Sequence, residues 1–106
     1  MRYAARVDRN QKDIIDALEK VGATVETIRS VHGGCPDLLV GFQGRNYLIE
    51  CKVPVEGRLS EIQMVWRDDW SGGKPFVIRT VEDVILWAQL VSCLPTMAGQ
   101  KRKVIG

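Results

Sequence analysis

Three polar residues near the middle of the chain have types and spacing suited to hydrolytic chemistry. Glu50 and Lys52 are two residues apart in the apolar segment 47–53, and Asp37 begins the apolar segment 37–42. Alternate residues of a strand point to the same face, so Glu50 and Lys52 share a face. If the two segments form a hairpin, the start of the first strand lies beside the end of the second. The sequence therefore predicts that Asp37 and Glu50 meet, with Lys52 close by.

Two carboxylates at this separation favour a divalent cation between them. Carboxylates a few Å apart repel each other, and their oxygen atoms are the ligands that Mg²⁺ and Mn²⁺ prefer. Such an ion can activate a water molecule and stabilise charge on a phosphoryl oxygen. Lys52 would reach the same water or the phosphate as a point charge. Gly33 and Gly34 lack side chains and would let a nucleic-acid backbone approach Asp37.

The apolar pattern predicts the elements that position these residues. Helical spacing up to Gly22 predicts a first helix, with Asp8 or Asn10 as its N-cap residue. Further patterns predict strands over 23–28, 37–42, 47–53 and 75–79, and helices that begin at residues 59 and 81, the latter capped by Thr80. This order predicts an α/β (α+β) fold in which a small mixed sheet is flanked by helices.

Length and composition restrict the classes of protein that fit the sequence. A chain of 106 residues, 45% of them hydrophobic and with a net charge of +2, is expected to form one domain over residues 1–94, followed by a basic tail over 95–106. No apolar run approaches the roughly 20 residues of a membrane span, and no secretory signal is recognisable, so we expect a cytoplasmic protein without a membrane partner. The three cysteines and the single histidine do not have the spacing of a zinc site.

Three segments resemble a known nuclease family. Residues 34–37 (GCPD) and 50–52 (ECK) resemble the PD-(D/E)xK nuclease signature, and residues 59–63 (LSEIQ) resemble the helix start of its virus-type replication-repair (VRR-NUC) branch. The resemblance extends over residues 8–84. It implies a restriction-endonuclease-like αβββαβ core and hydrolysis of DNA phosphodiester bonds that depends on Mg²⁺ or Mn²⁺.

Compact stand-alone members of this branch, from phages and bacteria, resemble Holliday junction resolvases that act as homodimers. The resemblance therefore implies a structure-selective endonuclease, branched DNA as its substrate, and a second copy of the chain as its partner. It also implies the cytoplasm of a bacterial or phage-infected host cell as the compartment.

The resemblance implies a role for each matching residue. Asp37, Glu50, Lys52 and Gln63 would be catalytic, and the metal would be held by Asp37, Glu50 and the backbone carbonyl of Cys51. The side chain of Cys51 occupies a position that is commonly apolar, so we expect it in the core.

The first helix departs from the family pattern. Many relatives have a glutamate there that contacts the metal through water, whereas this chain offers Asp8, Asn10, Gln11 and Asp13. Gln11 stands closest to the family pattern, and Asp8 is the acid that we expect at the outer part of the metal site.

Ordinary structural roles compete with several of these interpretations. Alternating charge is typical of any half-solvated strand, so Glu50 and Lys52 alone would indicate an ion pair. Ser60 and Gln63 fit a capping box as well as a place in the site. The lone His32 is either a solvated loop residue or a phosphate contact.

The aromatic and basic residues outside the motif also have two interpretations. The helical spacing of Trp66, Trp70 and Trp87 favours the core or a dimer interface over stacking on DNA bases. Arg58 and Lys74 flank the second helix and are expected to contact DNA, together with Gly33, Gly34 and His32. Two other classes of protein remain open: a catalytically inactive DNA-binding or scaffold module with the nuclease fold, and a dimeric structural protein that binds neither metal nor DNA.

Overall fold

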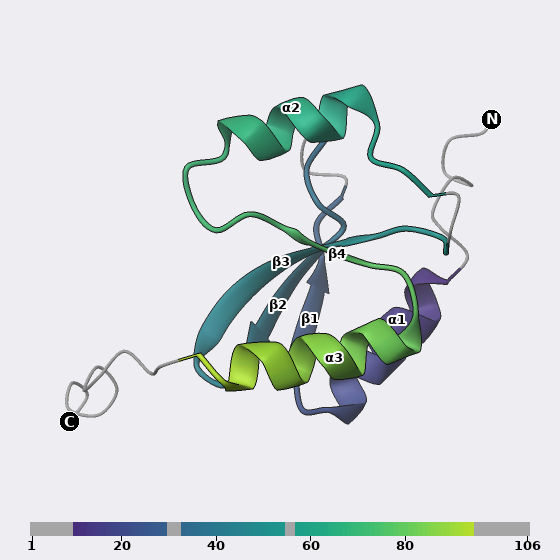
Figure 1. Cartoon of the computed structure of the whole chain (residues 1–106), viewed down its shortest axis with the longest axis vertical. Coiled ribbons are helices and arrows are strands. Elements are labelled where there is room, and N and C mark those ends of the chain that lie inside the picture. The colour runs from purple at the N-terminus through teal and green to yellow at the C-terminus, as the bar shows by residue number, and fades with distance from the viewer. Residues whose placement is uncertain (1–9, 30–32, 55–56, 95–106) are drawn as a thin grey trace.

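The computed structural model describes residues 10–29, 33–54 and 57–94 (Figure 1). Its elements follow the order expected from the sequence: α1 (Gln11–Lys20), β1 (Thr24–Thr27), β2 (Leu38–Phe42), β3 (Arg45–Cys51), α2 (Glu61–Asp69), β4 (Phe76–Ile78) and α3 (Val81–Ser92). Asp8, His32 and the tail over 95–106 lie outside the described residues. Within the described ranges, no helix is long and apolar enough to cross a membrane.

The strands form one mixed sheet in the order β1-β2-β3-β4. β1 and β3 are both antiparallel to β2, whereas β4 is parallel to β3. The β2–β3 hairpin turns at Gln43 and Gly44, whose φ angles of 51° and 81° are both left-handed. A two-residue hairpin needs this conformation because it matches the twist of the two strands. The predicted hairpin, the small mixed sheet and the α+β class are confirmed.

One face of the sheet is covered by α1 and α3, and the hydrophobic core lies between the helices and that face (Figure 1). Ile14 and Leu18 on α1 are fully buried there, and the Cys51 side chain is buried with them, as predicted. Trp87 on α3 packs on Phe42, with ring centroids 5.2 Å apart. Because burying one large apolar side chain stabilises a fold by about 1.5–3 kcal/mol, this face supplies most of the packing energy.

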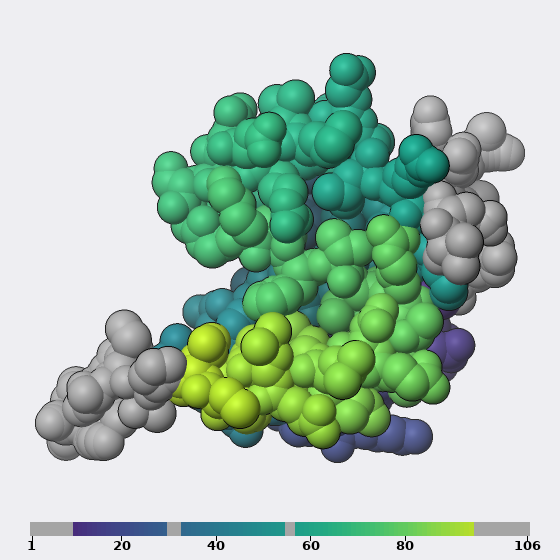
Figure 2. Space-filling model, in the orientation of Figure 1, coloured from purple at the N-terminus to yellow at the C-terminus, as the bar shows by residue number. Residues whose placement is uncertain are grey.

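The helix α2 lies apart from α1 and α3 (Figure 1), and none of its residues is buried. With the loop that follows, it forms a lobe that a hollow separates from the rest of the molecule (Figure 2). Trp66 and Trp70 stack on each other in this lobe, with ring centroids 4.6 Å apart. Trp87 thus lies in the core, whereas Trp66 and Trp70 do not, because helical spacing predicts an apolar face but not what covers it. For Trp66 and Trp70 the dimer interface stays a prediction.

The helix starts include one correction to the sequence analysis. Ser60 and Thr80 each form a complete capping box with the residue three positions later. Asn10 occupies the N-cap position of α1, but its side chain makes no capping bond. Its Nδ2 instead donates to the carbonyl oxygens of Lys52, at 2.9 Å, and Arg79, at 2.6 Å. The predicted capping role of Asn10 is wrong because its amide satisfies two carbonyls where β3 and β4 end.

Candidate active site

The sheet register brings Asp37 and Glu50 together. Leu38 pairs with Ile49 across the β2–β3 hairpin, so the residue before Leu38 lies opposite the residue after Ile49. The two acids lie on the face that points away from the core, and each is only 4% exposed. The backbone N–H of Cys51 donates to Asp37 Oδ2 at 2.8 Å, which fixes the orientation of that carboxylate.

The Glu50 carboxyl has an unusual affinity for protons. Its pKa is raised from 4.5 to about 8, chiefly by burial and then by the negative charge of Asp37. A hydrogen bond to Asp37 raises this pKa further, while the charges of Lys52 and Arg29 lower it. Because two buried carboxylates in contact cannot both carry a full charge at low cost, the pair retains one proton at neutral pH.

Two cationic side chains flank the carboxylate pair. Lys52 Nζ lies 3.7 Å from Glu50 Oε2, and Arg29 Nε lies 3.7 Å from Asp37 Oδ1. Sequence reasoning identified Lys52 but missed Arg29. The signal for Arg29 is the pairing of β1 with β2: Ile28 N donates to the Asp37 carbonyl at 2.8 Å, which places the next residue beside Asp37. That pairing is not evident from the short apolar pattern of residues 23–28.

Gln63 forms the predicted capping box and also contacts Glu50, while its catalytic role stays a prediction. Its backbone N–H donates to Ser60 Oγ, and its Oε1 accepts from Ser60 N, which completes the capping box at the start of α2. Its Nε2 donates to Glu50 Oε2 at 2.6 Å. The Gln63 side chain therefore caps the start of α2 and also bonds to the Glu50 carboxyl group. This one residue fixes the position of α2 relative to the carboxylate pair.

The first turn of α1 also lies close to the end of β3. The bond from Asn10 to the Lys52 carbonyl joins the two segments. Gln11 is buried, and its Oε1 has no hydrogen-bond partner among the described residues, whereas Asp13 is exposed. Among Asn10, Gln11 and Asp13, the described candidates at the start of the first helix, only Gln11 is buried.

The donor set suits a hard divalent cation, although it is small. Among residues 10–29, 33–54 and 57–94 there is no group of three or more histidine, cysteine or acidic side chains that could hold a metal. Asp37 and Glu50 nevertheless supply adjacent buried oxygen atoms, which is the chemistry that Mg²⁺ and Mn²⁺ prefer. A cation there would replace the shared proton. The Cys51 carbonyl as a third ligand stays a prediction.

The thiol of Cys35 lies in the electrostatic field of the carboxylate pair. Its pKa is raised above the ordinary value by burial, then by the charges of Glu50 and Asp37. The thiol therefore stays protonated at neutral pH and is not poised as a nucleophile.

Packing against α2 is a structural reason for Gly33 and Gly34 in the loop before β2. A Cβ at Gly34, where φ is +83°, would lie 2.6 Å from the Ile62 carbonyl oxygen, and one at Gly33 would lie 3.3 Å from Ile62 Cδ1. At Gly34 the loop before β2 can thus approach the backbone of α2 closely only without a side chain, whereas at Gly33 the Ile62 side chain would have to shift slightly. Contact of Gly33 and Gly34 with DNA stays a prediction.

The basic residues predicted to contact DNA differ in their surroundings. Arg58 is exposed on the loop before α2. Lys74 Nζ donates to the carbonyl oxygens of Arg67 and Trp70, at 2.7 and 2.8 Å, at the end of α2. Cations stabilise helix carboxyl ends in this way, so Lys74 holds the α2–β4 loop in place. Its contact with DNA, like that of Arg58, stays a prediction.

Comparisons with protein-family models, with curated proteins and with solved structures found no match to this chain.

Proposed function

We propose that this protein is a metal-dependent DNA endonuclease of the PD-(D/E)xK superfamily, resembling its VRR-NUC branch. The observation that carries the proposal is the meeting of Asp37 and Glu50 on one face of the sheet, with the Lys52 ammonium 3.7 Å from Glu50. Two acids that can hold a divalent cation, with a lysine beside them, fit metal-assisted hydrolysis of a phosphodiester. The αβββαβ order of elements agrees with the same assignment.

Each residue of the site has a role that follows from its contacts. A bound Mg²⁺ or Mn²⁺ ion would supply Lewis-acid stabilisation of the phosphoryl oxygen and would lower the pKa of a water molecule. Asp37, oriented by the Cys51 N–H, and Glu50, oriented by Gln63, would hold the cation. Lys52 stabilises negative charge on the attacking water or the scissile phosphate. Arg29 offsets charge at Asp37.

Access to the carboxylates requires a movement at α2. Both acids are almost completely covered, and Gln63 of α2 bonds directly to Glu50. Because α2 buries none of its own residues, its displacement breaks few apolar contacts. Substrate and metal therefore enter from the side of α2.

The substrate class, oligomeric state and compartment extend the proposal. Branched DNA and a homodimer follow from the family resemblance, and exposed apolar residues support association with a second copy: Ile62, Met64 and Val65 on α2, and Ile85, Leu86 and Leu90 on α3. A dimer places two sites on one branched molecule. We place the protein in the cytoplasm of a bacterial or phage-infected cell.

A second candidate function is an inactive DNA-binding or scaffold module with the nuclease fold. The observation that favours it is that the carboxylate pair already has partners within the protein, since Glu50 contacts Gln63 and Lys52. Among the described residues, no third acidic side chain joins the two carboxylates. Such a module would bind DNA without cutting it.

A cleavage assay with matched lysine variants separates these two functions. Purified protein is incubated with labelled four-way junction, flap, duplex and single-stranded DNA, in Mg²⁺, Mn²⁺ or EDTA. We expect metal-dependent cuts that Lys52→Ala slows by about 10²–10³-fold and that Lys12→Ala, on the exposed side of α1, leaves unchanged. Binding of DNA without cleavage of any substrate would favour the inactive module. Cleavage that persists in EDTA or in Lys52→Ala would contradict the assigned site.

A further inference from the structure

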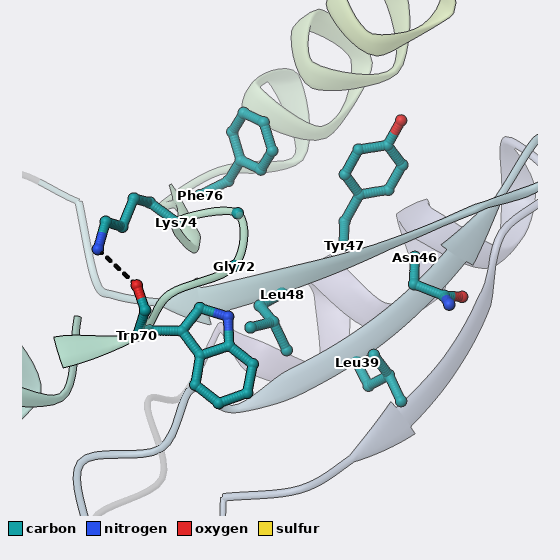
Figure 3. Close-up of a pocket in the computed structure, with 9 residues that line it drawn as sticks. Leu39, Asn46, Tyr47, Leu48, Trp70, Gly72, Lys74 and Phe76 are labelled. Carbon is teal, nitrogen blue, oxygen red and sulfur yellow. Dashed lines mark hydrogen bonds between the residues drawn. The ribbon is translucent and has the colours of Figure 1, made fainter. Parts of the chain in front are cut away.

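A cavity lies beside β3 (Figure 3), and Leu39 and Leu48, which line it, are on the same face of the sheet as the two carboxylates. Its volume is about 520 Å³, within the range of about 300–1,000 Å³ that small-molecule sites occupy. Leu39 and Leu48 pair directly across the β2–β3 hairpin and line the cavity. Leu39 is two residues from Asp37, and Leu48 is two residues from Glu50. The leucine pair therefore lies on the same face as the acid pair, about 7 Å from it at the usual rise of a strand.

The cavity exists because β4 is shorter than β3. β4 pairs only with residues 49–51 of β3, so no described strand pairs with residues 46–48 on that side. The chain over 70–75 bends away from the sheet there, and the Trp70 ring faces Leu48 across the cavity (Figure 3). Lys74, bonded to the Trp70 carbonyl, fixes this bend.

The lining has the chemistry of a site for a flat aromatic group. Trp70 contributes its aromatic ring on this face, and the Asn46 amide lies on the rim as a donor and acceptor. Tyr47 and Phe76 line the cavity from the side of the core, where both rings pack on Trp87. Trp70 is 43% exposed although it is stacked on Trp66. Among the described residues, no acidic side chain lines the cavity, and Lys74 adds positive charge to its lining. This environment suits a nucleobase attached to an anionic backbone.

We propose that this cavity binds one unpaired nucleobase of the DNA strand whose phosphate lies at Asp37 and Glu50. The distance from the acid pair to the leucine pair is within the reach from a phosphate to the base of the same nucleotide. The inference rests on the proposed function and narrows its substrate class. The preferred substrate is branched DNA with an unpaired nucleotide next to the cleaved bond, rather than fully paired duplex.

The test measures binding without cleavage, so that it is independent of nuclease activity. Fluorescence anisotropy in EDTA compares a labelled flap that has one unpaired nucleotide at the branch with the same flap carrying an abasic sugar there. We expect the wild-type protein to bind the base-containing flap about tenfold more tightly, the effect of one stacked base. Trp70→Ala and Leu39→Gln should remove this difference, and Leu94→Gln, at an exposed leucine after α3, should retain it.

The outcomes distinguish this inference from the proposed function. Equal affinity for the two flaps, with metal-dependent cleavage retained, would overturn the base site alone. Loss of the difference in Trp70→Ala without any metal-dependent cleavage by the wild type would support the base site and overturn the nuclease. Conversion of a dimer to a monomer by Trp70→Ala, with an unchanged preference for the base, would overturn the inference and make the cavity an interface between copies. Absence of binding to any DNA would overturn both proposals.

Discussion

The two faces of the sheet differ in what their side chains do. On the α1–α3 face, apolar residues such as Leu38, Val40 and Ile49 are fully buried and pack as a core. On the α2 face, the covered side chains are carboxylates, and the helix above them buries no residue. Stability therefore comes mainly from one face, and the proposed chemistry lies on the other. Neighbouring residues of one strand should respond differently to substitution.

The largest expected contrast is between Ile49 and Glu50, which are adjacent on β3 and point to opposite faces. Ile49→Ala should lower the free energy of unfolding by about 2–5 kcal/mol because it leaves a cavity in the core. Glu50→Gln should leave the stability at neutral pH equal or higher, because it replaces a protonated buried carboxyl by a neutral amide of the same shape. Urea denaturation at pH 7 in EDTA measures both. A Glu50→Gln variant as unstable as Ile49→Ala would contradict the division between the faces.

A metal ion should stabilise the protein through the carboxylate face alone. Mn²⁺ at about a hundred times its dissociation constant adds about 2.7 kcal/mol to the free energy of unfolding if it binds only the folded chain. Thermal melting with and without Mn²⁺ should show a rise in Tm for the wild type and none for Glu50→Gln. Asp16→Asn, an exposed change on α1, serves as the control and should retain the rise. An equal rise in Glu50→Gln would place the metal elsewhere.

The metal-free protein should become less stable as the pH rises. The Glu50 pKa of about 8 in the folded chain lies above the ordinary value of 4.5 that it regains on unfolding. Between these values the folded state holds a proton that the unfolded state has lost, so the stabilisation is complete below pH 4.5 and is lost as the pH passes 8. We expect a decrease on the order of 3 kcal/mol between pH 5.5 and 8.5 in EDTA. Glu50→Gln should reduce this slope, and a wild-type stability that rises over this range would contradict the shared proton.

The smallest contrast concerns the two capping boxes. Thr80→Ala should lower the global free energy of unfolding by about 1 kcal/mol, because it removes the capping hydrogen bond at the start of a helix that is part of the core. Ser60→Ala should loosen α2 with little effect on global unfolding, since α2 buries no residue. Hydrogen exchange of the α2 amides would register that local change. Equal losses of global stability would show that α2 unfolds together with the core.

Much of the fold could be predicted from the sequence because it depends on local patterns. Alternating apolar residues and the Gln43–Gly44 turn define the hairpin, and the hairpin register brings Asp37 to Glu50. Features that depend on distant segments could not be predicted in this way. Arg29 reaches the site through pairing of β1 with β2, and Asn10 bonds to carbonyls 42 and 69 residues away.

The exposed position of α2 is the clearest example of what local pattern leaves open. Ile62 and Val65 have the helical spacing of residues that pack on a core, yet they are 56% and 54% exposed. Spacing indicates that a helix has an apolar face, whereas the layer that covers this face is set by the lengths of the connecting segments and by partners. The cavity beside Trp70 arises from the same cause, since it depends on where β4 stops pairing with β3.

The most direct test of the central claim is the single-turnover rate of DNA cleavage in Mn²⁺ by Asp37→Asn and by its matched control Asp16→Asn. Both variants remove one negative charge, but only Asp37 meets Glu50 on the α2 face of the sheet. The account predicts that Asp37→Asn cuts flap or junction DNA at least about a hundredfold more slowly than the wild type and that Asp16→Asn cuts at the wild-type rate. Equal rates for the two variants would contradict the assignment of the active site.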